Sequence, residues 1–144
     1  MTERFLADPE AMEALGVELA NLLKPPRVVT LDGPLGAGKT TLVRACLRAL
    51  GYPGPVRSPT YTLIESYPLS DRTLHHLDLY RLGDPDELEL IGVRDLATAD
   101  AVWLIEWPDR GGDRLPPVDW ALCLDYVDDG RRVRGLPEEL RRRS

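Results

Sequence analysis

The chain of 144 residues has the length of one domain, with 43% hydrophobic and 29% charged residues, as in ordinary soluble globular proteins. Its net charge of −6 and pI near 4.9 argue against autonomous nucleic-acid binding, because neutralising phosphates requires a basic surface. No run approaches eighteen apolar residues, and residues 1–10 carry acids where a signal peptide has its apolar core. We therefore expect a single domain over residues 1–144, located in the cytoplasm, without a membrane or DNA partner.

The first predicted element is a helix over residues 8–23. Asp8 can cap its N-terminus and Pro9 suits its first position. One apolar stripe recurs at helical spacing and should face the core; it consists of Met12, Leu15, Leu19 and Leu22.

A strand, a turn and a second helix follow. The β-branched run at residues 27–31 predicts a buried strand, and residues 32–38 form a glycine-rich turn. Residues 39–50 predict a helix that Gly51 ends as a C-cap. This strand–turn–helix order is the context in which a phosphate-binding loop occurs.

The middle of the chain predicts a hairpin. After a loop rich in proline and glycine at residues 51–59, two strands are expected at 60–69 and 73–82, joined by a short turn at 70–72. The second strand alternates, with Leu74, His76, Asp78 and Tyr80 on one face and His75, Leu77 and Leu79 on the other.

The last third predicts a helix and three strands. Residues 84–96 indicate a helix followed by an irregular stretch, and the apolar run at 101–107 is typical of a strand covered on both faces. A strand at 119–127 then turns into a possible return strand at 131–136 and a short helical stub. Helices and strands in this order predict an α/β, P-loop NTPase-like sandwich with a mixed, partly parallel sheet and flanking helices.

Charge is distributed unevenly along the chain. Residues 131–144 hold six arginines and two glutamates and carry +4, which leaves −10 on the remainder. We expect this basic end to be solvated, with RNA or an acidic partner as the alternative. The two cysteines, Cys46 and Cys123, match no metal-site spacing, and we expect both to be buried reduced thiols.

The pattern G-x-x-x-x-G-K-[ST] occurs at Gly33, Gly38, Lys39 and Thr40, after a predicted strand and at the start of a predicted helix. Glycines let the backbone turn tightly with its N–H groups pointing at an anion, and the helix dipole favours negative charge at its N-terminus. Lys39 would reach the β- and γ-phosphates and Thr40 would ligate Mg²⁺. The pattern therefore predicts phosphate binding.

An acid at the end of a neighbouring strand must complete such a metal site. Glu106 ends the apolar run at 101–106, and Asp78 shares a strand face with His76. One of the two acids could ligate the metal while the other orients the attacking water. His76 alone is weak evidence, and two histidines are too few for a zinc site.

The kind of reaction stays open at this point. Guanine recognition in small GTPases depends on an N/T-K-x-D element, but the chain has only two lysines, Lys24 and Lys39, and neither lies in that pattern. Adenine is therefore favoured, and ATP with Mg²⁺ is the expected ligand. A small-molecule kinase would need a lid, which the short chain after Glu106 does not provide. Alternatives are such a kinase and a non-catalytic, nucleotide-dependent binding module.

Several motifs together resemble the bacterial TsaE (YjeE) family of P-loop ATPases, which serve in the synthesis of tRNA threonylcarbamoyladenosine. The resemblance covers nearly the whole chain, and the strings that carry it are "LDGPLGAGKTTLVR", "VRSPTYTLIESY", "LHHLDLYRL", "ELELIG" and "WLIEWPDR". It implies slow ATP hydrolysis that resets or supports a complex with TsaB and TsaD. In that complex TsaD performs the carbamoyl transfer. The resemblance implies that this chain interacts with tRNA only indirectly, through the complex.

The resemblance also implies roles for single residues. Thr40 and Glu106 would hold Mg²⁺, Asp78 would be a catalytic or metal-associated acid, and Thr60 would take a switch-like position near the γ-phosphate. Lys39 would act in catalysis as well as in binding. The nucleotide-binding residues would be Gly33, Pro34, Leu35, Gly36, Ala37, Gly38, Lys39, Thr40, Thr41 and Trp107. Family members commonly have a threonine near the base where this chain has Met12, so a hydroxyl contact to adenine is excluded there.

Overall fold

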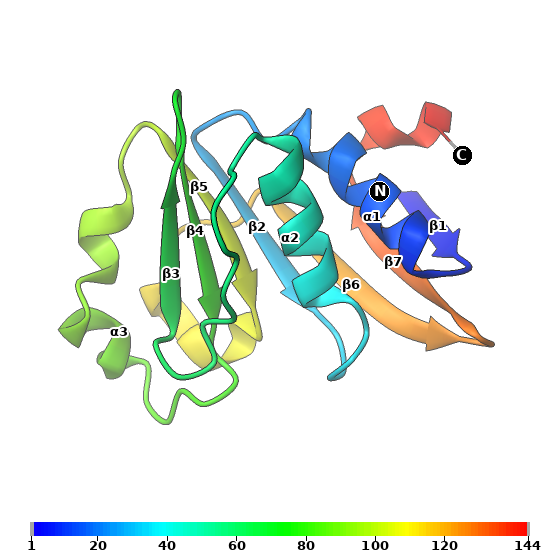
Figure 1. The fold of residues 1–144 in the computed structure, drawn as a ribbon. Helices are drawn as coiled ribbons and strands as arrows, with labels where there is room; N and C mark the ends of the chain where they lie inside the picture. The colour runs from blue at the N-terminus through cyan, green and yellow to red at the C-terminus, as the bar shows by residue number, and fades with distance from the viewer. Residues whose placement is uncertain (1, 144) are drawn as a thin grey trace.

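Residues 2–143, the part of the chain that this computed structural model describes, form one mixed sheet of seven strands with helices on both faces (Figure 1). The side chains of residues 141–143 lie outside the description. The elements in chain order are β1 (Thr2–Leu6), α1 (Pro9–Ala20), β2 (Arg27–Asp32), α2 (Lys39–Ala49), β3 (Ile64–Pro68), β4 (Thr73–Asp78), α3 (Asp86–Leu90), η1 (Val93–Leu96), β5 (Ala101–Glu106), η2 (Pro108–Arg114), β6 (Trp120–Val127), β7 (Gly130–Leu136) and η3 (Glu138–Arg143), where η marks a 3₁₀ helix.

The strand order is β1-β7-β6-β2-β5-β4-β3. Strands β6, β2, β5 and β4 run parallel, while β3 pairs antiparallel with β4 and β7 pairs antiparallel with β6 and β1. In this register Glu106 at the end of β5 lies opposite both Leu31 and Asp78. The carboxyl ends of β2, β5 and β4 therefore meet at one edge, where open α/β sheets bind their ligands.

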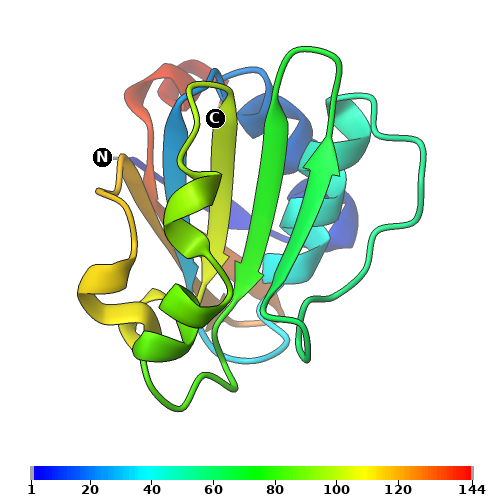
Figure 2. The ribbon, with the colours of Figure 1, turned by 90° about the vertical axis from the view of Figure 1, so that its left-hand side faces the viewer.

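Two layers of helix cover the sheet. Helices α1 and α2 pack on one face, and α3, η1 and η2 lie on the opposite face (Figure 2). Each face has its own core, and β5 between them is buried along its whole length, as its apolar run predicts. The expected sandwich with a mixed, partly parallel sheet is confirmed.

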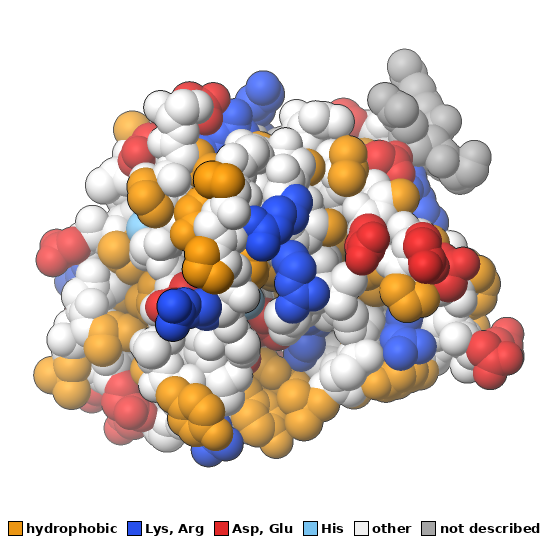
Figure 3. Space-filling view, viewed as in Figure 1, with side chains coloured by type: hydrophobic (Ala, Val, Ile, Leu, Met, Phe, Trp, Pro, Cys, Tyr) orange, Lys and Arg blue, Asp and Glu red, His pale blue; other side chains and the backbone are white. Residues whose placement is uncertain are grey.

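Helix α1 begins as its sequence predicts. The Asp8 side chain accepts a hydrogen bond from the Ala11 N–H at 2.9 Å, and Pro9 occupies the first turn. The helix ends at Ala20, earlier than expected, so Leu22 lies beyond it and is half-buried. Figure 3 shows that Asp and Glu side chains gather over α1 on this face while Lys and Arg side chains lie over α2.

Three stretches differ from the sequence expectation. Residues 60–63 form a turn instead of the start of a strand, with the Leu63 N–H bonded to the Pro59 carbonyl and Leu63 at a positive φ of 69°. β4 stops at Asp78, because Leu79 accepts a turn hydrogen bond from Leu82. β1 was not predicted; it is an edge strand in which Leu6 alone is fully buried, so its sequence lacks the apolar alternation by which strands are found.

The basic end is only partly a solvated tail. Arg131, Arg132 and Arg134 belong to β7, where Arg132 and Arg134 both pair with Asp125. The predicted helical stub is a 3₁₀ helix at residues 138–143, and the side chains of the remaining three arginines lie outside the described residues. Cys46 is buried, but Cys123 is only half-buried, which corrects that expectation because β6 has one partly open side. Within residues 2–143, no helix has both the length and the apolar character that crossing a bilayer requires.

Candidate functional site

The loop between β2 and α2 folds as its glycines require. Gly33, Gly36 and Gly38 have positive φ values of 147°, 80° and 106°, a region that side chains disfavour. Space is also restricted, since a Cβ at Gly33 would lie 2.3 Å from the Leu124 carbonyl oxygen. The loop therefore places its backbone N–H groups immediately before the N-terminus of α2, which begins at Lys39.

Lys39 turns back over this loop. Its Nζ donates a hydrogen bond to the Gly33 carbonyl at 2.6 Å and lies 3.9 Å from the centre of the Trp107 ring. Burial lowers the pKa of Lys39, while the negative charges of Glu106 and Asp78 oppose that shift. The ammonium group thus stands inside the loop, with acids on one side and an indole on another.

Asp78 and Glu106 are neighbours at the carboxyl ends of β4 and β5. Both side chains are buried, and one Asp78 oxygen accepts the Tyr80 backbone N–H at 3.1 Å. Burial raises the pKa of Asp78, and the nearby Glu106 carboxylate raises it further. A cation between the two acids would relieve this repulsion.

His76 joins the same group from β4. Its Nε2 lies 2.6 Å from a Glu106 carboxylate oxygen, and the two side chains are 1% and 4% exposed. The sequence placed His76 on the face of Asp78 but gave no signal for its contact with Glu106. That contact depends on the pairing of β4 with β5, which is not readable from either strand alone.

Most of the predicted site residues line one cavity of about 270 Å³. It brings together two segments that are distant in sequence from the phosphate loop, namely the loop with Ser58 and Thr60 and the corner at Trp107, which has a positive φ of 55°. The hydroxyl groups of Ser58 and Thr60 lie 2.7 Å apart. The lining residues are Leu35, Gly36, Gly38, Lys39, Thr40, Thr41, Ser58, Thr60, Asp78, Glu106 and Trp107, so among the predicted residues Gly33, Pro34 and Ala37 do not line it.

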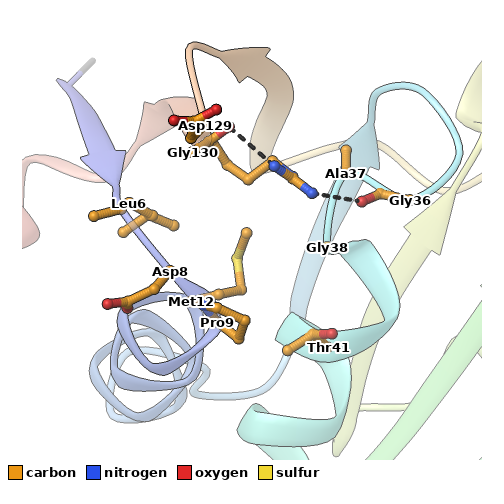
Figure 4. A pocket seen from close by; sticks show the side chains of 12 residues that line it. Leu6, Asp8, Pro9, Met12, Gly36, Ala37, Gly38, Thr41, Asp129 and Gly130 are labelled. Carbon is orange, nitrogen blue, oxygen red and sulfur yellow. Dashed lines mark hydrogen bonds between the residues drawn. The ribbon is translucent and has the colours of Figure 1, made fainter.

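A second cavity of about 250 Å³ lies on the other side of the loop (Figure 4). Met12 extends from α1 into this space, and its Cε would lie only 2.6 Å from a Cβ at Gly38. Met12 is thus both part of the apolar stripe and a wall of a cavity beside the loop. The remaining lining residues are Leu6, Ala7, Asp8, Pro9, Gly36, Ala37, Thr41, Asp129, Gly130 and Arg131.

Two residues that bond to the phosphate loop were missed by sequence reasoning. The Tyr126 hydroxyl donates to the Leu35 carbonyl at 2.8 Å, and Arg131 donates to the Gly36 carbonyl at 3.4 Å. They lie directly opposite each other on β6 and β7. The predicted hairpin at this point indicated that they would be close, but no motif connected the hairpin with the phosphate loop.

The donor groups of the first cavity suit Mg²⁺. Thr40 offers a hydroxyl and Asp78 and Glu106 offer carboxylates, and oxygen ligands are those that Mg²⁺ prefers. Among the described residues, no group of three or more His, Cys, Asp or Glu side chains could hold a metal ion alone. Mg²⁺ usually takes one or two protein carboxylates and completes its shell with phosphate oxygens and water.

A parallel strand, a loop of three glycines with positive φ, and a helix that begins with lysine and threonine define an α/β fold of the P-loop type. The model of the family described as "Threonylcarbamoyl adenosine biosynthesis protein TsaE" matches residues 6–133. The chain therefore belongs to the TsaE family.

Individual relatives agree with this assignment. The tRNA threonylcarbamoyladenosine biosynthesis protein TsaE of Haemophilus influenzae is 42% identical over 135 residues, covering 90% of this chain and 85% of the relative. The protein of the same name from Aquifex aeolicus is 38% identical over 134 residues, covering 92% of each chain. The crystal structure of Bacillus subtilis YdiB is similar in fold with a TM-score of 0.70 and 28% identity, covering 92% of this chain and 82% of that one.

Proposed function

We propose that this protein is a Mg²⁺-dependent ATPase required for tRNA threonylcarbamoyladenosine biosynthesis, where it acts with TsaB and TsaD. The observation that carries the proposal is the convergence of Lys39, Thr40, Thr60, Asp78 and Glu106 on one cavity at the carboxyl edge of the sheet. The names of the relatives support the pathway. Hydrolysis of ATP then supports or resets the modifying complex, and the protein does not itself modify the base.

Phosphate binding follows from the loop. The backbone N–H groups of residues 33–38 and the start of α2 offer donors and positive potential to the phosphate oxygens. Lys39 exchanges its bond to the Gly33 carbonyl for bonds to the phosphates, because a charged acceptor forms the stronger hydrogen bond. The depressed pKa of Lys39 rises again beside that negative charge.

Thr40 and Glu106 are the residues that would hold Mg²⁺, and His76 fixes one oxygen of Glu106. When bound, the cation neutralises charge that develops on the transferred phosphoryl group. Asp78 lies opposite Glu106, and its carboxylate orients the attacking water. The Thr60 hydroxyl, which is bonded to Ser58, closes the cavity on the side of the γ-phosphate.

The second cavity suits the adenine base. It borders the loop at Gly36 and Gly38 and reaches Thr41 in the first turn of α2. Met12 gives it an apolar wall, on which a base can pack through the polarisable thioether. Met12 therefore holds the base by packing, because this chain lacks the threonine hydroxyl that family members commonly have at this position.

The test is a reconstitution of tRNA threonylcarbamoylation with this protein, TsaB, TsaD, tRNA and ATP. Lys39→Ala and Glu106→Ala should each reduce ATP hydrolysis by at least a hundredfold, since each removes a group that acts on the transferred phosphoryl. Arg132→Met, on β7 away from the cavity, should leave hydrolysis unchanged. Normal modification with either site variant would refute the assigned site.

Two other outcomes would separate the alternatives. ATP binding without any turnover, even with both partners and tRNA present, would show a nucleotide-dependent binding module instead of an ATPase. ATP-dependent phosphorylation of a small metabolite, with modification of tRNA unaffected by removal of this chain, would show a kinase.

A further inference from the structure

The tip of the β6–β7 hairpin touches the phosphate loop from outside. The Tyr126 hydroxyl donates to the Leu35 carbonyl at 2.8 Å, and Arg131 donates to the carbonyls of Gly36 at 3.4 Å and Gly130 at 3.0 Å. Figure 4 draws the two arginine bonds as dashed lines that end at Gly36 and Gly130. Two consecutive carbonyls of the phosphate loop are thus held by one hairpin.

The two side chains act as a pair. Tyr126 and Arg131 are opposite each other in the antiparallel register, and the guanidinium carbon of Arg131 lies 4.2 Å from the centre of the Tyr126 ring. A stacked guanidinium keeps its donors in the plane and directed outward. Each residue therefore restricts the rotamers of the other while both bond to the loop.

The hairpin also approaches the loop closely. A Cβ at Gly36 would lie 2.6 Å from the Tyr126 hydroxyl oxygen. Gly36 therefore serves two purposes, because it supplies the positive φ of 80° and leaves room for the tyrosine.

The orientation of these carbonyls fixes the amides beside them. A trans peptide is planar, and its C=O and N–H point in opposite directions. Holding the Leu35 carbonyl toward Tyr126 directs the Gly36 N–H away from the hairpin, and the Gly36 carbonyl does the same for the Ala37 N–H. A glycine-rich loop otherwise has many backbone states to lose when it binds an anion.

We propose that Tyr126 and Arg131 are positioning residues, a hairpin clasp that holds the phosphate loop in its binding conformation. The inference rests on the proposed function, because it concerns the affinity of the same loop for ATP. The Tyr126 bond carries most of the effect, since 2.8 Å is a normal hydrogen bond and 3.4 Å is a long one.

The test compares Tyr126→Phe, Arg131→Met and the double variant with wild-type protein. Tyr126→Phe removes the hydroxyl and keeps the ring under Arg131. It should weaken ATP binding about threefold to tenfold, the value of one neutral hydrogen bond, and Arg131→Met should weaken it less. The double variant should lose more ATP affinity than Arg131→Met alone. Its fold-loss should be smaller than the product of the two single fold-losses, because the residues are coupled. Arg132→Met, on the opposite face of β7, is the matched control and should bind ATP as wild type does.

Hydrogen exchange in the protein without nucleotide provides an independent measurement. The Ala37 N–H donates to the Pro34 carbonyl at 3.2 Å, so its exchange rate reports opening of the loop. Tyr126→Phe should accelerate exchange at Ala37 severalfold while the thermal midpoint of unfolding stays within about 2 °C of wild type.

The outcomes separate this proposal from the function on which it rests. ATP affinity within twofold of wild type, together with unchanged exchange at Ala37, would overturn the clasp. Failure of wild-type protein to bind ATP would overturn the proposed function, and the exchange rate at Ala37 would still decide whether the hairpin holds the loop.

Discussion

His76 and Glu106 form a buried pair in which Nε2 lies 2.6 Å from a carboxylate oxygen. The pair links neighbouring strands diagonally, because His76 lies opposite Leu104 while Glu106 lies opposite Asp78. The other ring nitrogen of His76 is buried and finds no partner among the described residues. We infer that Nε2 carries the hydrogen and donates it, because a hydrogen on the other nitrogen would be buried without an acceptor.

The first prediction concerns His76→Ala. It should lower the free energy of unfolding by about 2–4 kcal/mol, because it removes a hydrogen bond to a buried carboxylate and leaves a cavity. It should also raise the Mg²⁺ concentration needed for ATP hydrolysis about tenfold or more, since Glu106 loses the group that orients it. Chemical denaturation and a Mg²⁺ titration of turnover measure the two effects.

His75→Ala is the control for this variant. His75 is buried and next to His76 in sequence, but it faces the opposite core. There its ring contacts the Trp103 ring at a tilt of 59°, and it bonds to Ser66. Its loss should destabilise the fold and leave the Mg²⁺ dependence unchanged. An equal shift of the Mg²⁺ titration in both variants would mean that His76 acts only through stability.

The second prediction concerns the pH dependence of stability at Asp78. Its native pKa is raised above the ordinary value of 3.8, chiefly by burial, so the folded protein holds this proton more tightly than the unfolded chain. Below about pH 3.8 Asp78 is protonated in both states and does not lower the free energy of unfolding. The free energy of unfolding falls as the pH rises through the native pKa of Asp78. Above the native pKa the whole penalty is present.

Asp78→Asn should therefore stabilise the protein without nucleotide at pH 7, by about 2–4 °C in Tm for each kcal/mol of penalty removed. The asparagine oxygen can still accept the Tyr80 N–H, so this loop contact is retained. ATP hydrolysis should fall at the same time. The Tm difference between Asp78→Asn and wild type is measured at pH 7 and near pH 3.5. An equal stabilisation at both pH values would contradict a cost that arises from the charge of Asp78.

The sequence predicts most of the fold because its strongest patterns are local. The stripe in α1, the apolar run of β5 and the glycine loop each occur within one continuous segment. β1 escapes prediction because only Leu6 among its residues is buried, and its pairing partner lies at the other end of the chain. The sequence of β1 therefore lacks the apolar periodicity on which such predictions depend.

The candidate site divides in the same way. Lys39 and Thr40 follow from a local motif, Glu106 follows from an acid at the end of an apolar strand, and Asp78 follows from the strand face that it shares with His76. The clasp by Tyr126 depends on β6 lying beside β2, which brings the predicted hairpin to the phosphate loop, and the bond from His76 depends on β4 lying beside β5. One sequence alone carries little signal for such pairings. It therefore reveals the residues that form the site but not the residues that hold them in position.

The third prediction concerns the two thiols. Burial raises the pKa of Cys46 to about 12, so only about one molecule in ten thousand carries the thiolate at pH 8. Cys46 also donates a weak hydrogen bond to the Gly16 carbonyl at 3.4 Å. In the folded protein a disulfide reagent should modify Cys123, which is half-buried, while Cys46 reacts only after denaturation.

Thiol titration with and without guanidinium measures this difference. The folded wild-type protein should react with one equivalent and the denatured protein with two. Cys123→Ser is the control and should show no fast reaction when folded. Fast modification of this variant would mean that α2 opens readily from the core.

The last prediction concerns the contact between the two helices on one face of the sheet. A Cβ at Gly16 in α1 would lie 2.4 Å from the Cβ of Ala45 in α2 and 3.2 Å from the Leu42 carbonyl oxygen. No rotamer change can relieve this overlap, because both groups are fixed to the helix backbones. Gly16→Ala gains about 1 kcal/mol of helix propensity, but overpacking costs typically 1–3 kcal/mol. We expect the clash to dominate and the free energy of unfolding to fall by about 1–2 kcal/mol.

Val17→Ala, at a half-exposed neighbour, is the control and should change the free energy of unfolding by less than about 0.5 kcal/mol. Chemical denaturation compares the two variants, and a Gly16→Ala protein as stable as wild type would mean that α1 and α2 separate at little cost.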